Sequence, residues 1–409
     1  MRFQTFLLIT AFFLSAQQAK AQSVAINTDG SAANASALLD VTSTQKGVLI
    51  PRMSRTERNA IAAPAAGLLV FQNAPDSLGF YYYTGTGWAW MHSNANADTL
   101  AWRTGGNTGT NANHFIGTAD NRDLIFKRNN VRSGYISTTN TAWGANALNP
   151  ASTGFNNTAL GLQALLSNTT SSRNTAIGVR ALTFNTTGAD NTAIGMETLR
   201  WNEGNSNVAV GFRSLDSNTT GYSNAAMGTK SLISNTIGFQ NSAVGMNALF
   251  SNTSGNNNVA SGFQSLYFNT SGYNNTANGM EALKANTSGY NNTATGTQAL
   301  FANTTGVFNT ATGVAALSSN TTGYNNTAMG MQALNSNING IFNTATGMAS
   351  LFFNTSGSAN TATGMDALKF NTIGYNNTAT GVSAMSANTE GIFNTATGVL
   401  ALSTNTTGS

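Results

Sequence analysis

The chain has 409 residues, no cysteine, and only 8% charged residues, against about a quarter in an ordinary globular protein. The missing cysteines exclude disulfides, thiolate nucleophiles and thiolate metal ligands. Two of the bases behind the formal charge of +4, Arg2 and Lys20, lie in the signal sequence described next, and from Asn140 onward seven basic residues balance seven acidic ones. Because basic residues are not clustered anywhere in the sequence, the composition argues against nucleic-acid binding.

Residues 1–21 have the pattern of a secretory signal peptide. Arg2 gives a positive start, Phe6–Leu14 an apolar core, and Ala19-Lys20-Ala21 a small-residue cleavage site. The core is too short for a transmembrane helix, and no later apolar run approaches twenty residues. We therefore expect a secreted protein without a transmembrane segment, extracellular or on the cell surface in association with an outer membrane.

Residues 22–92 are expected to form a small β-rich module. Ser54 followed by Glu57 predicts a capping box and a short helix reaching Ala62. The tyrosine run before Trp88 predicts an aromatic hairpin. Apolar runs bounded by turn residues, including the turn at Pro75-Asp76, predict strands at Ser23–Asn27, Ala37–Val41, Gly47–Met53, Gly67–Phe71 and Gly79–Tyr83.

Residues 93–139 are predicted to be a linker and an irregular β segment that closes with Asp123–Lys127. Gly105-Gly106-Asn107 indicates a turn rather than a phosphate-binding loop, because no helical pattern follows it. The two histidines of the chain, His92 and His114, lie outside the repeats that follow, and we assign them no catalytic role.

Residues 140–409 are sixteen copies of one unit, Asn-Thr-Ala-x-Gly-x-x-Ala-Leu-x-x-Asn-Thr-Thr-Gly-x-x, whose positions we number 1 to 17. Every step is 17 residues except that from Gly195 to Gly211, which is 16. So strict a period indicates a repeat architecture. The unit is too short for a helical hairpin and consists largely of poor helix formers. We predict an all-β fold, a parallel β-roll or β-solenoid of sixteen coils, on the order of 75 Å long.

The shorter unit supports this prediction. Its missing residue falls in Asn202-Glu203-Gly204, within the Asn-Thr-Thr-Gly turn of positions 12–15. Turns tolerate deletions, whereas the loss of one residue from a strand would move every side chain to the other face.

Four positions are expected to stack along the rod, as Asn191, Ala193, Gly195 and Leu199 illustrate. Asn at position 1, Ala at position 3 and Gly at position 5 occur in all sixteen units, and Leu at position 9 is nearly invariant. Asparagines above one another can form a hydrogen-bonded ladder, while alanine and glycine keep the interior narrow.

The predicted strand is apolar or small on both faces. Positions 2, 4 and 6 share one face, and positions 3 and 5 share the other. Position 6 is apolar in nearly every unit, and position 4 is apolar in the early units. One face can fill the coil and the other can contact a neighbouring chain. Because each coil buries little apolar surface of its own, an obligate oligomer is favoured.

The repeats resemble a known family. Asn191–Gly195, Asn207–Gly211 and Asn241–Gly245 are similar to the Asn-Ser-Val-Ala-Ile-Gly repeat of YadA-like head domains in trimeric autotransporter adhesins. The resemblance implies a left-handed parallel β-roll, three chains packed side by side and a role in surface attachment. This unit is longer than is usual there, and later copies replace Ile by Thr, as in Thr293–Gly296. We also expect neither the coiled-coil stalk nor the membrane β-barrel anchor of that family after the repeats.

The leader shows a second resemblance. Ala37–Val41 and Gly47–Met53 are similar to the start of large secreted tail-fibre-like surface proteins of Gram-negative bacteria, which often end in an endosialidase-type chaperone domain. The last residues, Asn405–Ser409, form a turn within a unit. We therefore expect the sequence to be a fragment, or a further domain to be missing from its gene model.

Catalysis, metals and cofactors are not predicted. The acidic residues of the repeats occupy differing positions and form no pair of fixed spacing. A calcium-binding β-roll needs a recurring Asp, which these units lack. We therefore predict a non-catalytic, adhesin-type structural fibre, most simply a homotrimer, that attaches to host extracellular matrix or another surface.

Aromatic residues in the turns are the candidate contact residues, either as an adhesive stripe or as clamps between coils or subunits: Tyr273, Tyr290, Phe308, Tyr324, Phe342, Tyr375 and Phe393. One alternative function is a passive spacer in a larger tail-fibre-like protein. Another is ice binding through a Thr-x-Thr ladder, although Met329 interrupts that ladder and the early units carry Ile or Val. The ladder consists of Thr293/Thr295, Thr310/Thr312, Thr344/Thr346, Thr361/Thr363, Thr378/Thr380 and Thr395/Thr397.

Overall fold

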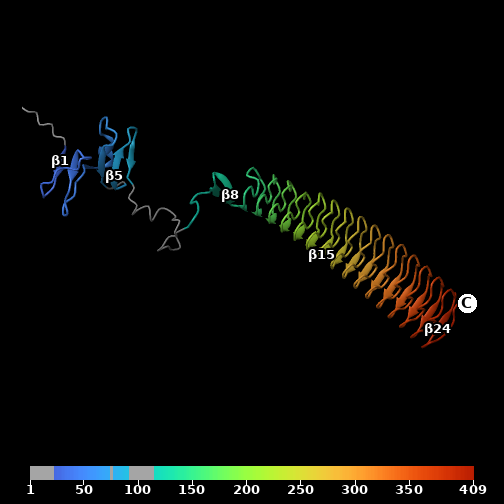
Figure 1. Ribbon diagram of the computed structural model, residues 1–409. Helices are drawn as coiled ribbons and strands as arrows, with labels where there is room; N and C mark the ends of the chain where they lie inside the picture. The colour runs from blue at the N-terminus through green and yellow to red at the C-terminus, as the bar shows by residue number, and fades with distance from the viewer. Residues whose placement is uncertain (1–22, 74–76, 92–114) are drawn as a thin grey trace, which may run out of the picture. The chain divides into compact units, whose positions relative to one another are not determined.

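The computed structural model describes residues 23–73, 77–91 and 115–409 (Figure 1). The chain divides into two compact units, one up to Ile116 and one from Gly117, and each is described by itself. The predicted signal peptide, the turn at Pro75-Asp76, the Gly105–Asn107 turn and both histidines lie outside the described residues.

The first unit is β-rich, as predicted. Two strands, β1 and β2, pair in parallel, and a second sheet has the order β3-β4-β5-β6 with β3 parallel to β4 and the other pairs antiparallel. Ser54 and Glu57 form the predicted capping box of α1, which ends at Asn59 rather than Ala62. The elements are β1 (Val24–Ile26), β2 (Leu39–Val41), β3 (Arg52–Met53), α1 (Arg55–Asn59), β4 (Leu69–Gln72), β5 (Gly79–Tyr83) and β6 (Trp88–Trp90).

The second unit opens with an antiparallel hairpin of β7 (Leu124–Arg128) and β8 (Val131–Ile136). Strand β8 also pairs antiparallel with β9 (Thr141–Trp143), the strand of the first coil. The hairpin therefore covers the outer edge of the first coil's strand, which would otherwise expose unpaired backbone groups. It falls in the segment that the sequence predicts as linker and irregular β structure, yet its hydrogen bonds join it to the repeat array.

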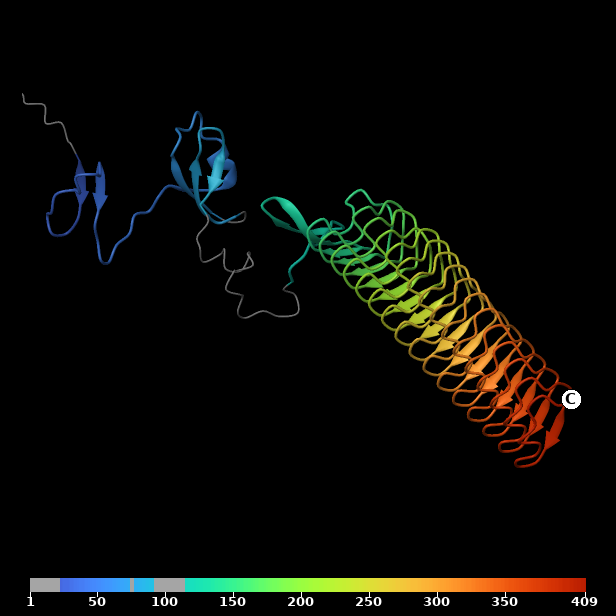
Figure 2. The ribbon, with the colours of Figure 1, turned by 45° about the vertical axis from the view of Figure 1, so that its right-hand side comes forward.

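Every later coil adds one three-residue strand, parallel to the strand before it and in register, as in the pairing of Ala277 with Ala294. The predicted β-solenoid of 17-residue coils is confirmed, and Figure 2 shows its strands lying one beside the next along the rod. The strands are β10 (Thr158–Leu160), β11 (Thr175–Ile177), β12 (Thr192–Ile194), β13 (Val208–Val210), β14 (Ala225–Met227), β15 (Ser242–Val244), β16 (Val259–Ser261), β17 (Thr276–Asn278), β18 (Thr293–Thr295), β19 (Thr310–Thr312), β20 (Thr327–Met329), β21 (Thr344–Thr346), β22 (Thr361–Thr363), β23 (Thr378–Thr380) and β24 (Thr395–Thr397).

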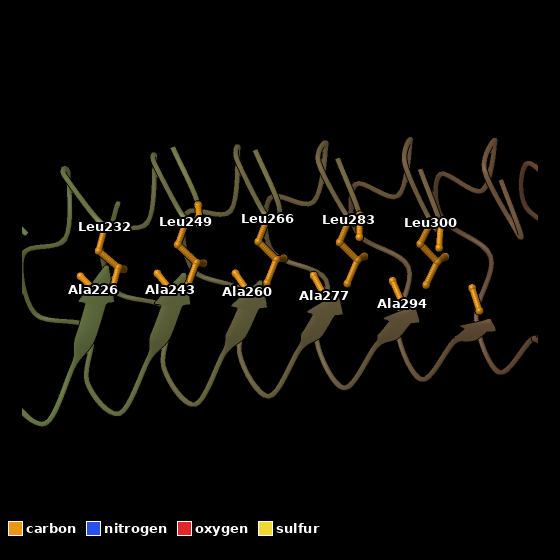
Figure 3. Packing of buried hydrophobic residues seen from close by; sticks show 14 of the residues in the cluster. Ala226, Leu232, Ala243, Leu249, Ala260, Leu266, Ala277, Leu283, Ala294 and Leu300 are labelled. Carbon is orange, nitrogen blue, oxygen red and sulfur yellow. The ribbon is translucent and has the colours of Figure 1, made fainter. Parts of the chain in front are cut away.

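The interior of the solenoid is a thin apolar column. Alanine at position 3 and leucine at position 9 face one another in nearly every coil, and both are fully buried in the pair Ala277 and Leu283 (Figure 3). Leu283 has φ +51°, a left-handed backbone that leucine seldom adopts. The same conformation recurs in coil after coil, so the packing of the leucine into the column outweighs its local strain.

The 16-residue coil leaves the strand register unchanged. Ile194, before the deletion, pairs with Val210 after it, as the equivalent residues do in every other coil. The deletion is therefore confined to the turn, as predicted.

Candidate functional site: the ladders and outer faces of the solenoid

The asparagine at position 1 forms a buried ladder along the array. The backbone N–H of Asn191 donates to Asn174 Oδ1 at 2.9 Å, and Asn207 N–H donates to Asn191 Oδ1 at 2.9 Å. Asn191 Nδ2 also donates to the carbonyl of Gly204 at 2.9 Å, across its own coil. Each such side chain thus links one coil to the next and fixes the turn of its own coil.

The asparagine at position 12 forms a second buried ladder, which the sequence analysis missed. Asn286 Nδ2 donates to Asn269 Oδ1 at 2.7 Å and to the carbonyl of Gly289 at 3.0 Å. The sequence analysis assigned this asparagine to turn chemistry alone. The overlooked signal is that Asn recurs there without exception from Asn168 to Asn405, whereas an ordinary turn also accepts Asp, Ser or Gly.

The other predicted stacking residues lie where close approach is needed. Ala193 and Leu199 are fully buried. Gly195 has φ +132°, and a Cβ there would lie 2.6 Å from the carbonyl oxygen of Gly211 in the next coil. Only glycine fits this contact, because both the backbone conformation and the space exclude a side chain.

Glu203 compensates for the residue missing from the short coil. Elsewhere one backbone carbonyl accepts the N–H groups of the preceding turn, as Thr236 O does for Thr219 and Thr220. At the deletion the Glu203 carboxylate accepts them instead, from Thr186 N–H at 3.2 Å and Thr187 N–H at 2.9 Å, together with both threonine hydroxyls. Burial raises the pKa of Glu203, but these hydrogen bonds outweigh it and hold the pKa below its ordinary value.

Replacing Glu203 by glutamine is expected to lower the free energy of unfolding by about 1–3 kcal/mol at neutral pH, because the amide NH₂ then opposes the threonine donors. A carboxyl with a lowered folded pKa stabilises above its unfolded pKa and loses that effect as the pH falls through the folded value. The loss of stability on acidification should therefore be smaller in E203Q.

Denaturant unfolding of E203Q and wild type at pH 7 and pH 3 measures both effects. Glu390→Gln is the matched control, since Glu390 is exposed in the corresponding turn of a full-length coil. Equal destabilisation of the two variants at pH 7 would contradict the role given to Glu203.

Charged side chains lie on the turns of the coils and mostly form ion pairs. The Asp216 carboxylate has 1% exposure and receives Arg200 Nε at 3.0 Å and Arg213 Nη2 at 2.8 Å. Arg173 pairs with Asp190, which lowers the pKa of the Asp190 carboxyl. Within the described residues, no group of three His, Cys, Asp or Glu side chains is placed to hold a metal ion.

The strand face, meaning positions 2, 4 and 6, carries no charged residue in any of the sixteen coils. Backbone ladder bonds continue beyond each strand, for example from Gly296 N–H to Asn278 O at 2.8 Å and from Gln298 N–H to Met280 O at 2.9 Å, so position 6 forms a third column beside positions 2 and 4. Large apolar side chains stay exposed in that column: Leu162, Val179, Met196, Phe212, Met246, Phe263, Met280, Val314, Met331, Met348, Met365, Val382 and Val399.

The candidate aromatics form contacts between successive coils. Tyr273 and Tyr290 stack with centroids 4.7 Å apart and planes 4° apart. Three further pairs from successive coils meet edge to face at 5.4–5.5 Å: Tyr290 with Phe308, Tyr324 with Phe342, and Tyr375 with Phe393. Such contacts stabilise adjacent coils, while Phe393 keeps 65% of its surface exposed. We call these seven residues the aromatic ridge.

The first unit contains a match to a known protein family. Residues 25–112 match the family model of a phage tail like trimerisation region. The match supports a homotrimer and, together with the solenoid, fits a structural fibre of the tail-fibre-like kind that the leader resembles. No curated protein and no solved structure matches the chain. The likeness to YadA-like heads therefore rests on the repeat motif and stays a prediction.

The α1 helix has five residues, and no described helix has the length and apolar character needed to cross a bilayer.

Proposed function

We propose that the chain is a subunit of a secreted homotrimeric fibre that attaches a cell to a surface and has no catalytic role. One observation carries the proposal: a trimerisation-type leader precedes sixteen stacked coils. The outer surface of these coils presents a charge-free strand face and the aromatic ridge. The resemblance to adhesin heads and to a secretory signal peptide supports placement outside the cell.

The strand face is the surface we assign to packing between subunits. Large apolar side chains at position 6 are 37–70% exposed in a single chain and recur in most coils, and an exposed apolar stripe of this kind usually marks an interaction site. In the first seven coils position 4 adds a second apolar column, for example Ile194 and Val244. The charges sit at the turns, where they keep a packed fibre soluble.

The aromatic ridge is the surface we assign to attachment, because it lies on the turns rather than on the strand face.

Binding of the secreted chain to immobilised collagen, fibronectin and bare polystyrene tests whether the aromatic ridge mediates attachment. We expect the triple variant Phe308→Ser, Phe342→Ser, Phe393→Ser to lose binding at least tenfold. The matched control replaces exposed aromatics of another turn, Phe268→Ser with Phe370→Ser. Equal loss in both variants, or no binding to any of the three surfaces by the wild type, would contradict attachment through the ridge.

One observation favours the ice-binding alternative. The Thr-x-Thr side chains of β18, β19 and β21 to β24 point outward in register, as Thr293 with Thr310 and Thr295 with Thr312. However, bulky side chains such as Met331 and Met348 occupy the neighbouring column, and Met329 interrupts the threonines. We therefore expect no thermal hysteresis from the purified chain at micromolar concentration, and a clear hysteresis gap would favour ice binding.

A further inference from the structure

The sheet β3-β4-β5-β6 of the first unit carries large apolar side chains on both of its faces. Residues alternate between the two faces along each strand. On one face Val70 of β4 and Tyr81 of β5 lie opposite each other and are 2% and 9% exposed. Helix α1 covers this face, with the guanidinium of Arg58 4.1 Å from the centroid of the Tyr81 ring. This face is the core of the module.

The opposite face, which we call the open face, stays exposed in the single chain. Phe71 lies opposite Phe80 with ring centroids 5.0 Å apart. Phe80 and Tyr82 keep 42% and 40% of their surface exposed. An antiparallel sheet that faced water on this side would carry polar residues there.

An apolar segment borders the open face and forms a concave surface with it. Val48 and Leu49 are 56% and 77% exposed. The cavity between this segment and the sheet has a volume of about 230 Å³ and is lined by Val48, Leu49, Ile50, Arg52, Phe71 and Phe80. Arg52 is the one charged side chain of that lining.

We propose that the open face is where two further copies of the chain bind. The inference deepens the proposed homotrimer and rests on it. The match to a trimerisation region covers all the residues of this face. None of these residues is negatively charged, so acidic side chains of two copies would not repel one another when the faces meet. Three Arg52 side chains would repel one another at a common axis, so the geometry points to Phe80 and Tyr82 near the centre and Arg52 at the rim.

Because the chain has no cysteine, a thiol crosslinker reacts only at a cysteine that is introduced, and a crosslink then shows that this position lies near the same position of another copy. We would introduce Phe80→Cys and Tyr82→Cys separately into the secreted chain and treat each with a short bismaleimide. Thr56→Cys is the matched control, because Thr56 is exposed on α1, over the covered face. We expect covalent dimers on denaturing gels for the two open-face variants and single subunits for the control. Loss of the trimer in an open-face variant alone would also support the proposal.

Two results would overturn it. One is equal crosslinking of Thr56→Cys, and the other is no crosslinking of either open-face variant in a chain that still sediments as a trimer. A wild-type chain that sediments as a single subunit would instead remove the homotrimer itself, so the two failures can be told apart.

Discussion

Replacing Gly296 by alanine is expected to break the stacking between two neighbouring coils. Gly296 has φ +130°, and an added Cβ would lie 2.5 Å from the carbonyl oxygen of Gly313. Neither backbone can move without disturbing the ladder, so we expect a loss of more than about 3 kcal/mol in the free energy of unfolding. Since each coil contacts only its neighbours, the array should then unfold in two transitions instead of one, which circular dichroism during denaturant titration would show.

Gly398→Ala is the control for this prediction. Gly398 has a similar backbone, φ +127°, but the nearest atom to an added Cβ is Ala401 Cβ at 3.8 Å. The control carries the backbone strain of about 1–3 kcal/mol without the clash, and it should keep a single transition. If the two variants unfold alike, close packing between coils does not explain the recurring glycine.

The second large effect is expected for Asn326→Ala. The side chain of Asn326 accepts the buried backbone N–H of Asn343 at 3.0 Å and donates to the carbonyl of Gly340 at 2.8 Å. Its removal leaves the Asn343 N–H without this partner in the buried interior. An unsatisfied buried donor and the lost amide contacts together cost about 2–4 kcal/mol, measurable as a lower denaturant midpoint.

Asn339 provides a control within the same coil, since it is exposed at position 14 of the turn. Asn339→Ala should change the free energy of unfolding by less than about 0.5 kcal/mol. A comparable loss in both variants would mean that asparagine acts here through turn propensity and not through the ladder.

The regularity of the array made its fold predictable from sequence. A period of 17 with one deletion of a turn residue predicts stacked coils, and an invariant Ala with a nearly invariant Leu predicts the column that fills them. The conformation of the leucine was not predictable, because a left-handed φ at Leu283 follows from the closure of the coil and not from any local preference of leucine.

Other features depended on contacts that a single unit does not contain. The ladder at position 12 looks like turn chemistry in one repeat, and only stacking brings Asn286 onto Asn269. The role of Glu203 appears only beside the threonines of the preceding turn. The β7–β8 hairpin has no repeat signature, so its pairing with the first coil could not be read from periodicity.

The candidate contact residues were predictable as a set but not in their arrangement. The sequence placed seven aromatics in equivalent turns, and left clamping and adhesion as alternatives. The structure shows contacts between the rings of successive coils, for example Tyr324 with Phe342, which accounts for part of their role through stability. Attachment through their exposed edges stays a prediction, because ligand recognition depends on a partner and not on the fold.

The central claim is that three copies of the chain form one fibre. Sedimentation equilibrium of the purified chain at micromolar concentration tests it most directly, because the mass it returns does not depend on shape. We predict a single species of three times the subunit mass across the concentration range. A single species of one subunit mass would contradict the account, including the packing of strand faces and the assignment of the open face.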